Sequence, residues 1–147
     1  MKNLYIFDWD GTLSDSLARI VAAMQAASAD NGMPRPAAKA VHGIVGLGLD
    51  EGVAALFPTL AGSAQAHIVE AYRVHYRALE KHGEHLFPGV ETFLLELRER
   101  GHKLAVATGK SRAGLDRVMA KLGVDSYFHA SRCDDEAASK QIGRAHV

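Results

Sequence analysis

Two aspartates near the N-terminus are the residues whose type and spacing best suit chemistry. Asp8 and Asp10 belong to an Asp-Trp-Asp-Gly-Thr-Leu run that follows the apolar segment 4–7. Residues two apart on an extended backbone point their side chains the same way. One carboxylate can attack phosphorus, while the other protonates the leaving oxygen and then activates water. A divalent cation is needed because carboxylate and phosphate repel each other, and oxygen ligands favour Mg²⁺.

The same two aspartates have two other interpretations. They could simply end a strand and form a turn. They could also belong to an EF-hand loop, but that pattern needs a further Asp or Asn before its glycine and a preceding helix, and neither is present. Because ligands in open parallel sheets bind beyond the carboxyl ends of the strands, the position after a buried strand favours the catalytic interpretation.

A second polar stretch follows the apolar segment 103–107. Thr108, Gly109, Lys110 and Ser111 precede a segment with helical periodicity. A hydroxyl, a glycine and a helix N-terminus can together hold phosphate oxygens. Taken alone the signal is weak, because Thr108 could be a strand-end residue and Ser111 an N-cap. Its place after the next strand favours a phosphate site.

Lys140 is a further candidate. It follows a third strand candidate at 127–130 and an acidic, alanine-containing stretch at 134–139. A lone lysine is usually a solvated surface charge, but a cation is wanted near two carboxylates and a phosphate. The residues by themselves leave both interpretations open.

The elements that must position these residues alternate between strand and helix. Segments 4–7, 103–107 and 127–130 predict strands, with helices between them. Such alternation implies right-handed crossovers and a parallel sheet. We therefore predict an α/β fold with a partial Rossmann-like core formed by residues 1–13 and 87–140. Segment 14–86 lacks the period-2 alternation of a strand and predicts an inserted helical domain.

Composition narrows the class of protein. Seventeen basic residues balance seventeen acidic ones among 147, so there is no general electrostatic reason to bind nucleic acid or an anionic membrane. The single cysteine, Cys133, excludes an intramolecular disulfide and fits a reducing compartment. No segment is typical of a signal peptide or a membrane span. We expect a cytoplasmic protein with an unreactive thiol, and the oligomeric state stays open.

These motifs together resemble the haloacid dehalogenase superfamily, in particular its phosphoglycolate phosphatase-like branch. The resemblance rests on the Asp8-x-Asp10 run, the helical insertion, the Pro-Gly-Val at 88–90 and the Thr108 loop, and it covers residues 1–140. It implies that Asp8 is the nucleophile that forms an aspartyl-phosphate and a Mg²⁺ ligand. It implies that Asp10 is the general acid/base and lends its backbone carbonyl to the metal.

The resemblance also assigns the groups around the phosphate. Thr108 would bind the transferring phosphoryl group and Lys140 would be the third-motif lysine, with Gly11, Thr12 and Gly109 completing the phosphate site. The helical segment would be a cap that closes the site and selects the substrate. Asp10 argues against dehalogenation, because a halide leaves without protonation and dehalogenases usually carry tyrosine at that position.

The chain departs from the family after Lys140. The acidic metal ligands of the fourth motif are absent, and residues 141–147 have neither apolar periodicity nor an acid. The codons CAG ATC GGA AGA GCA CAC GTC would encode them, and from the second base onward this sequence resembles a common short-read sequencing adapter read in frame. We therefore expect a non-native tail on a C-terminally truncated fragment that is inactive by itself, with the strand 4–7 exposed on the side where a fourth strand belongs.

The predicted function is Mg²⁺-dependent hydrolysis of a small phosphomonoester such as 2-phosphoglycolate, through an aspartyl-phosphate. A sugar-phosphate phosphomutase is one alternative, since it uses the same intermediate but returns the phosphoryl group to the substrate. A non-catalytic binding or regulatory domain with a degenerate site is another.

Overall fold

The computed structural model describes residues 1–136 and divides the chain into two compact units. One unit combines Met1–Asp15 with the chain from His85 onward, and the other is Ser16–Glu84. Within the described residues, no helix combines the length and the apolar character needed to cross a membrane.

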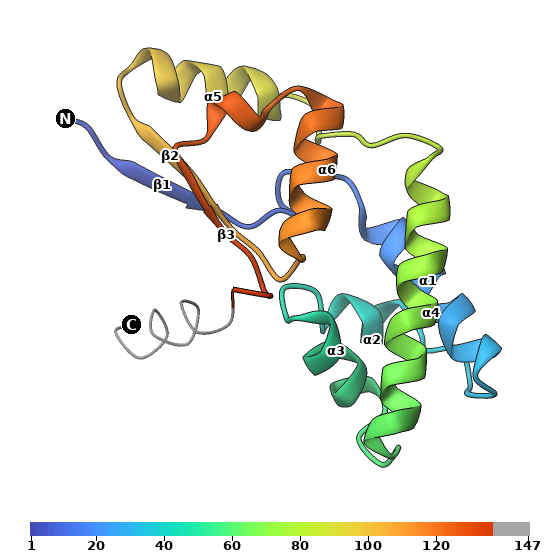
Figure 1. Ribbon diagram of the computed structural model, residues 1–147. Helices are drawn as coiled ribbons and strands as arrows, with labels where there is room; N and C mark the ends of the chain where they lie inside the picture. Colours follow the sequence, from blue (N-terminus) through green and yellow to red (C-terminus); the bar gives the residue numbers. More distant parts are fainter. Residues whose placement is uncertain (137–147) are drawn as a thin grey trace. The chain divides into compact units, whose positions relative to one another are not determined.

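The first unit is built on a parallel sheet of three strands in the order β1-β2-β3 (Figure 1). The strands are β1 (Leu4–Phe7), β2 (Lys103–Ala107) and β3 (Ala130–Arg132). The helices of this unit are α5 (Val90–Glu99) and α6 (Arg112–Leu122). The predicted α/β fold with a parallel sheet is confirmed.

The third strand does not lie where the sequence predicted it. Residues 127–130 are predicted to be extended, but Asp125–Tyr127 form a short 3₁₀ helix, η1. Phe128 is extended, the His129 N–H donates to the Leu104 carbonyl of β2 at 2.7 Å, and β3 itself begins at Ala130, opposite Ala105. The aromatic side chains Tyr127 and Phe128 pack into the hydrophobic clusters beside the sheet. Packing of these rings, rather than strand pairing, therefore decides the conformation at this point.

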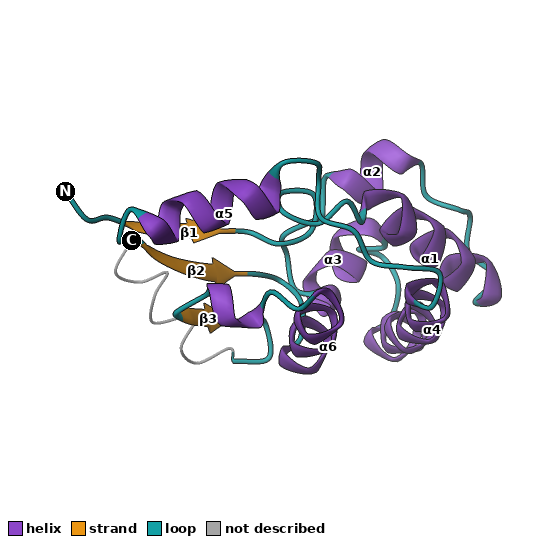
Figure 2. Ribbon diagram, turned by 90° about the horizontal axis from the view of Figure 1, so that it is seen from above, coloured by secondary structure: helices purple, strands orange, loops and turns teal. Residues whose placement is uncertain are grey.

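Both helices of the unit pack on the same face of the sheet (Figures 1 and 2). Leu104 and Val106, two residues apart on β2, point to one face. Leu104 clusters with α5 side chains, and Val106 clusters with α6 side chains. Two right-handed crossovers that proceed in one direction across a sheet place their helices on one face.

The other face of the sheet is open at β1 within the described residues. The apolar run 4–7 predicted a buried strand, but Leu4 and Ile6 are 59% and 63% exposed. That prediction was wrong for β1 because both crossover helices lie over the opposite face. It was correct for β2, whose Leu104, Ala105 and Val106 are all buried.

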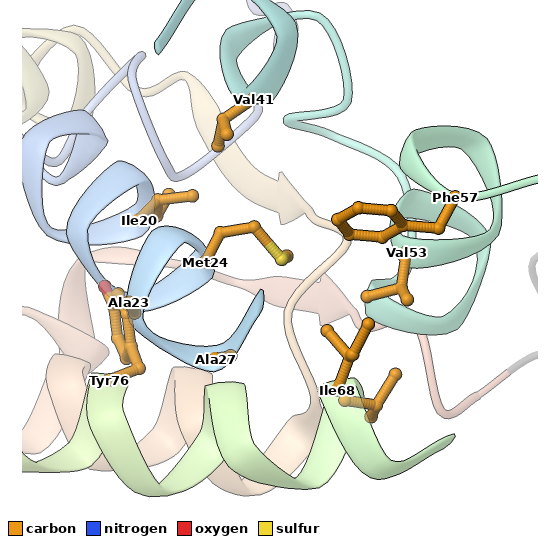
Figure 3. Close-up of a cluster of buried hydrophobic side chains, with 10 residues drawn as sticks. Ile20, Ala23, Met24, Ala27, Val41, Val53, Phe57, Ile68 and Tyr76 are labelled. Carbon is orange, nitrogen blue, oxygen red and sulfur yellow. The ribbon is translucent and has the colours of Figure 1, made fainter. Parts of the chain in front are cut away.

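The second unit is entirely helical. It contains α1 (Leu17–Asp30), α2 (Ala38–His42), α3 (Leu49–Leu56) and α4 (Gly62–Glu80). Apolar residues at helical spacing on α1 meet those of the other helices in one core (Figure 3). That core is made by Ile20, Ala23, Met24, Ala27, Val41, Val53, Phe57, Ile68, Val69 and Tyr76.

A buried ion pair joins the two ends of the helical unit. Arg19, in the first turn of α1, lies 2.8 Å from the carboxylate of Glu84 and donates to the carbonyl of Gly83 at 2.6 Å. Its guanidinium carbon is 6.0 Å from the ring centre of Tyr76. Breaking a buried pair leaves an uncompensated charge, so this contact holds the entry and exit of the unit together.

Candidate active site

The loop after β1 is folded around one carbonyl. The oxygen of Trp9 accepts hydrogen bonds from the backbone N–H groups of Thr12, Leu13 and Ser14 at 3.0–3.2 Å. Gly11 donates to the Ser14 carbonyl at 2.9 Å and has φ +75°, a conformation that suits glycine. Gly11 and Thr12 are both predicted phosphate-binding residues, and the backbone N–H group of each donates inside this turn.

Trp9 anchors the two aspartates that flank it. Its side chain is fully buried and meets Phe128 edge to face, with ring centres 6.4 Å apart. The side chains of Asp8 and Asp10 are only partly buried, and the Trp9 N–H donates to Asp8 Oδ1 at 2.7 Å. A fully buried residue between two partly buried aspartates fixes both of them at the carboxyl end of β1.

The loop after β2 is held by hydrogen bonds of its own. Thr108 Oγ1 accepts from the N–H of Lys110 at 3.1 Å, and the Thr108 N–H donates to the carbonyl of Arg132 at 3.0 Å. Because the hydroxyl oxygen acts as acceptor there, its hydrogen can still be donated to a phosphoryl oxygen. Ser111 is the N-cap of α6, with Oγ accepting from the Gly114 N–H at 3.1 Å.

The two loops meet at one edge of the sheet. Phe7 lies opposite Val106 in the parallel register, so the residues that follow each strand emerge side by side. The ammonium of Lys110 is 3.5 Å from Asp10 Oδ1, and the two side chains are 11% and 14% exposed. The structure thus brings the first predicted motif against the second.

The sequence pattern assigns no role to Lys110 by itself. The signal available was its place directly after Thr108 and Gly109, in the loop already assigned to phosphate. Lys140, the cation that was assigned a role, lies outside the described residues. Gly109, which is predicted to bind phosphate, lies between Thr108 and Lys110, and these two residues are hydrogen-bonded to each other.

The oxygen atoms of Asp8 and Asp10 suit the usual coordination of Mg²⁺ in proteins. Among residues 1–136, no three His, Cys, Asp or Glu side chains gather closely enough to form a metal cage. Mg²⁺ is commonly held by one or two carboxylates, with waters and substrate phosphate completing an octahedron. The hard oxygens of Asp8 and the Asp10 carbonyl fit that mode of binding.

Cys133 belongs to the packing and not to the chemistry. The residue is 1% exposed, and burial raises the pKa of its thiol to about 11. The thiolate is the reactive form of cysteine, so the group is inert at neutral pH. This agrees with the expected unreactive thiol.

The family model described as haloacid dehalogenase-like hydrolase matches residues 5–141. The chain belongs to this family. The resemblance seen in the motifs is therefore confirmed, and the members it matches among curated proteins include several named phosphoglycolate phosphatase.

Two relatives and one solved structure illustrate the range within this hydrolase family. The tyrosine-protein kinase PtkA of Mycobacterium tuberculosis is 38% identical over 98% of this chain and 50% of its own length. The plasmid-borne phosphoglycolate phosphatase of Cupriavidus necator is 31% identical over 90% of this chain and 59% of its own. The structure of the Mycobacterium tuberculosis PtkA aligns with a TM-score of 0.74, at 35% identity, over 90% of this chain and 59% of that one. The chain spans about half the length of the first of these relatives.

Proposed function

We propose that the protein is a Mg²⁺-dependent phosphomonoester hydrolase that works through an aspartyl-phosphate on Asp8. The observation that carries the proposal is the meeting of two carboxylates at the end of β1 with Thr108 and Lys110 at the end of β2, joined by the contact between Asp10 and Lys110. Family membership and phosphatase-named relatives support it.

In the first half-reaction, a carboxylate oxygen of Asp8 forms a bond to phosphorus while the ester P–O bond breaks. Asp10 gives its proton to the departing alkoxide. In the second half-reaction, water attacks phosphorus, Asp10 takes the proton back, and the bond between Asp8 and phosphorus breaks to release phosphate.

The remaining groups bind and screen charge. Thr108 would donate its hydroxyl hydrogen to a phosphoryl oxygen, and Lys110 would place a cation beside the anionic site. Mg²⁺ bound by Asp8 and the Asp10 carbonyl would supply the electrostatic shielding that lets a carboxylate approach a phosphate. Lys140 is proposed as a second cation.

We propose a small phosphorylated metabolite as substrate, of the 2-phosphoglycolate kind, and no nucleic acid or membrane partner. The proposal treats the helical unit Ser16–Glu84 as a cap, since a lid that closes on a site excludes bulky polymers and stray water. The balanced charge of the chain agrees with a small ligand bound at a local site. A cytoplasmic location is proposed with it.

One observation favours a second candidate. A relative 38% identical to this chain is named a tyrosine-protein kinase. Phosphoryl transfer between a nucleotide and protein tyrosine would use the same edge of the sheet but a different acceptor.

The deciding experiment assays the product of the complete natural gene beside the 147-residue chain. Phosphate release is measured over a panel with 2-phosphoglycolate, sugar phosphates and a phosphotyrosine peptide, with Mg²⁺ or with EDTA, and the Asp8→Asn variant serves as the blank. Mg²⁺-dependent release from small esters supports the proposal.

Other results point elsewhere. Isomerised sugar phosphate without phosphate release identifies a phosphomutase. Transfer of label from ATP to tyrosine identifies the kinase. Binding of phosphate without turnover of any panel member identifies a binding domain.

A further inference from the structure

One arginine at the start of α6 holds the loop that follows β3. Nη1 of Arg112 donates to Ser131 Oγ at 2.7 Å and to Asp116 Oδ1 at 3.2 Å. Nη2 donates to the Ser131 carbonyl at 3.0 Å and to Glu136 Oε1 at 2.8 Å. The planar guanidinium therefore bridges the first and last residues of the segment 131–136.

The segment 131–136, hereafter the β3 loop, is also tied from its own side. Asp135 Oδ1 accepts from the backbone N–H of Arg112 at 2.8 Å, and Glu136 Oε1 accepts from the Cys133 N–H at 2.8 Å. The N–H of Cys133 and the guanidinium of Arg112 lower the pKa of Glu136, so this carboxylate stays charged at neutral pH. The β3 loop therefore binds both the backbone and the side chain of Arg112.

The β3 loop in turn holds the loop after β2. The carbonyl of Arg132 accepts from the Thr108 N–H at 3.0 Å, and the Asp134 N–H donates to the Lys110 carbonyl at 2.8 Å. Arg132 and Asp134, which bind Thr108 and Lys110, both lie between Ser131 and Glu136, the two residues that the Arg112 side chain binds.

We propose that Arg112 is a positioning residue, which holds the β3 loop so that Thr108 and Lys110 face the phosphoryl group in the correct geometry. The inference rests on the proposed function, which makes those two residues phosphate-binding groups. Arginine suits this task because its rigid fork can bind a carbonyl, a hydroxyl and a carboxylate at once, whereas an ammonium is a point charge.

A simpler interpretation is a surface ion pair, since the side chains of Arg112 and Glu136 are both 34% exposed. Exposed pairs contribute little to stability. The two interpretations differ in what they predict, because a surface pair has no reason to alter phosphate affinity.

Arg98 offers a matched control. Its Nη1 donates to the carbonyls of Ser126 and Tyr127 at 3.1 and 2.8 Å, so it also ties a helix to the chain around β3. Those carbonyls precede β3, while the β3 loop follows it. Arg98→Met therefore removes similar hydrogen bonds at the opposite end of the strand.

The test compares Arg112→Met, Arg112→Lys, Glu136→Gln and Arg98→Met in the complete protein. The measurements are kcat and KM for the best ester of the panel, the affinity for inorganic phosphate by titration, and the midpoint of thermal unfolding. Arg112→Met should lower kcat/KM and weaken phosphate binding by about tenfold to a hundredfold, the order expected for a small misplacement of catalytic groups. Arg112→Lys and Glu136→Gln should shift both in the same direction by less, and Arg98→Met should leave both within about threefold while it lowers the unfolding midpoint.

A double-mutant cycle shows whether Arg112 acts through Thr108. In a Thr108→Ala background, Arg112→Met should lose most of its effect on phosphate affinity, because coupled residues are not additive. Equal losses in the Arg112 and Arg98 variants, or additive losses in the cycle, would overturn the proposal. So would a wild-type protein that binds no phosphate. If wild type binds phosphate but hydrolyses no ester, the proposed function fails, while the binding titration still decides the role of Arg112.

Discussion

The two faces of the sheet differ although the sequence of β1 is apolar on both. Tyr5 and Phe7 point to the face that α5 and α6 cover, where Leu104 is fully buried. Leu4 and Ile6 point to the other face and are more than half exposed. The covered face carries the core of the unit, and the open face carries apolar surface that the described residues leave in contact with solvent.

The residues that stabilise this unit are not the residues proposed to carry out the reaction. Trp9, which anchors the two aspartates, shares its cluster with Val106 and Leu115 on the covered face. The aspartates themselves lie at the strand ends and add little to that core. We therefore expect changes at the strand ends to affect turnover, changes on the covered face to affect folding, and changes on the open face to affect association.

The largest effect is expected from Asp8→Asn in the complete protein. An amide cannot attack phosphorus, so turnover should fall to the assay background. The urea midpoint should stay close to that of the wild type, because the side chain lies outside the core. Phosphate release and urea unfolding measure the two quantities, and near-normal activity of this variant would contradict the mechanism.

Asp10→Asn should slow turnover by about a hundredfold to ten-thousandfold, the usual contribution of acid/base catalysis. The nucleophile remains, so the loss should be smaller for esters with good leaving groups, which need less protonation. Steady-state rates with an alkyl and a nitrophenyl phosphate make the comparison. An equal loss on both esters would count against a proton-transfer role.

A pair of truncations compares the two faces directly. Leu104→Ala on the covered face should lower the free energy of unfolding by about 2–5 kcal/mol, since it opens a cavity in a packed core. Ile6→Ala on the open face should cost less than about 1 kcal/mol, because little apolar surface is uncovered. Urea unfolding of both variants in the 147-residue chain tests this, and equal losses would show that the open face is covered in solution.

Self-association should follow the open face. β1 is an edge strand of the sheet formed by the described residues, and its own residues Leu4 and Ile6 are exposed on the open face. An edge strand with exposed apolar side chains favours contact between molecules. Replacing both residues by lysine should shift the 147-residue chain toward monomer in light scattering after gel filtration. The double change Val74→Lys and Leu47→Lys, at exposed apolar residues of the helical unit, is the control. A wild-type chain that is already monomeric would refute the expectation.

The smallest effect concerns Cys133. With a thiol pKa of about 11, roughly one thiol in a thousand is ionised at pH 8, so a disulfide reagent should label the folded chain very slowly and the urea-unfolded chain quickly. The raised pKa also means that the thiol supports folding below its ordinary pKa and that this support is lost as the pH rises through about 11. Rapid labelling of the folded chain at pH 8 would show that the covered face opens.

The sequence by itself determined the order of the elements, the parallel sheet and the two loops that carry polar residues. These features depend on local signals: apolar runs, helical periodicity, and the turn residues that end each segment. The motifs that contain Asp8, Asp10 and Thr108 also indicated the family.

Only the tertiary structure decided which face of β1 is covered, where β3 begins, and which cations meet the site loops. Burial of Leu4 depends on which helices the chain places over it, and the 3₁₀ turn at Tyr127 depends on the packing of its ring. Lys110 meets Asp10, and Arg112 meets Ser131 and Glu136, across long stretches of chain. Such contacts arise from the register of parallel strands, which no local pattern of residues encodes.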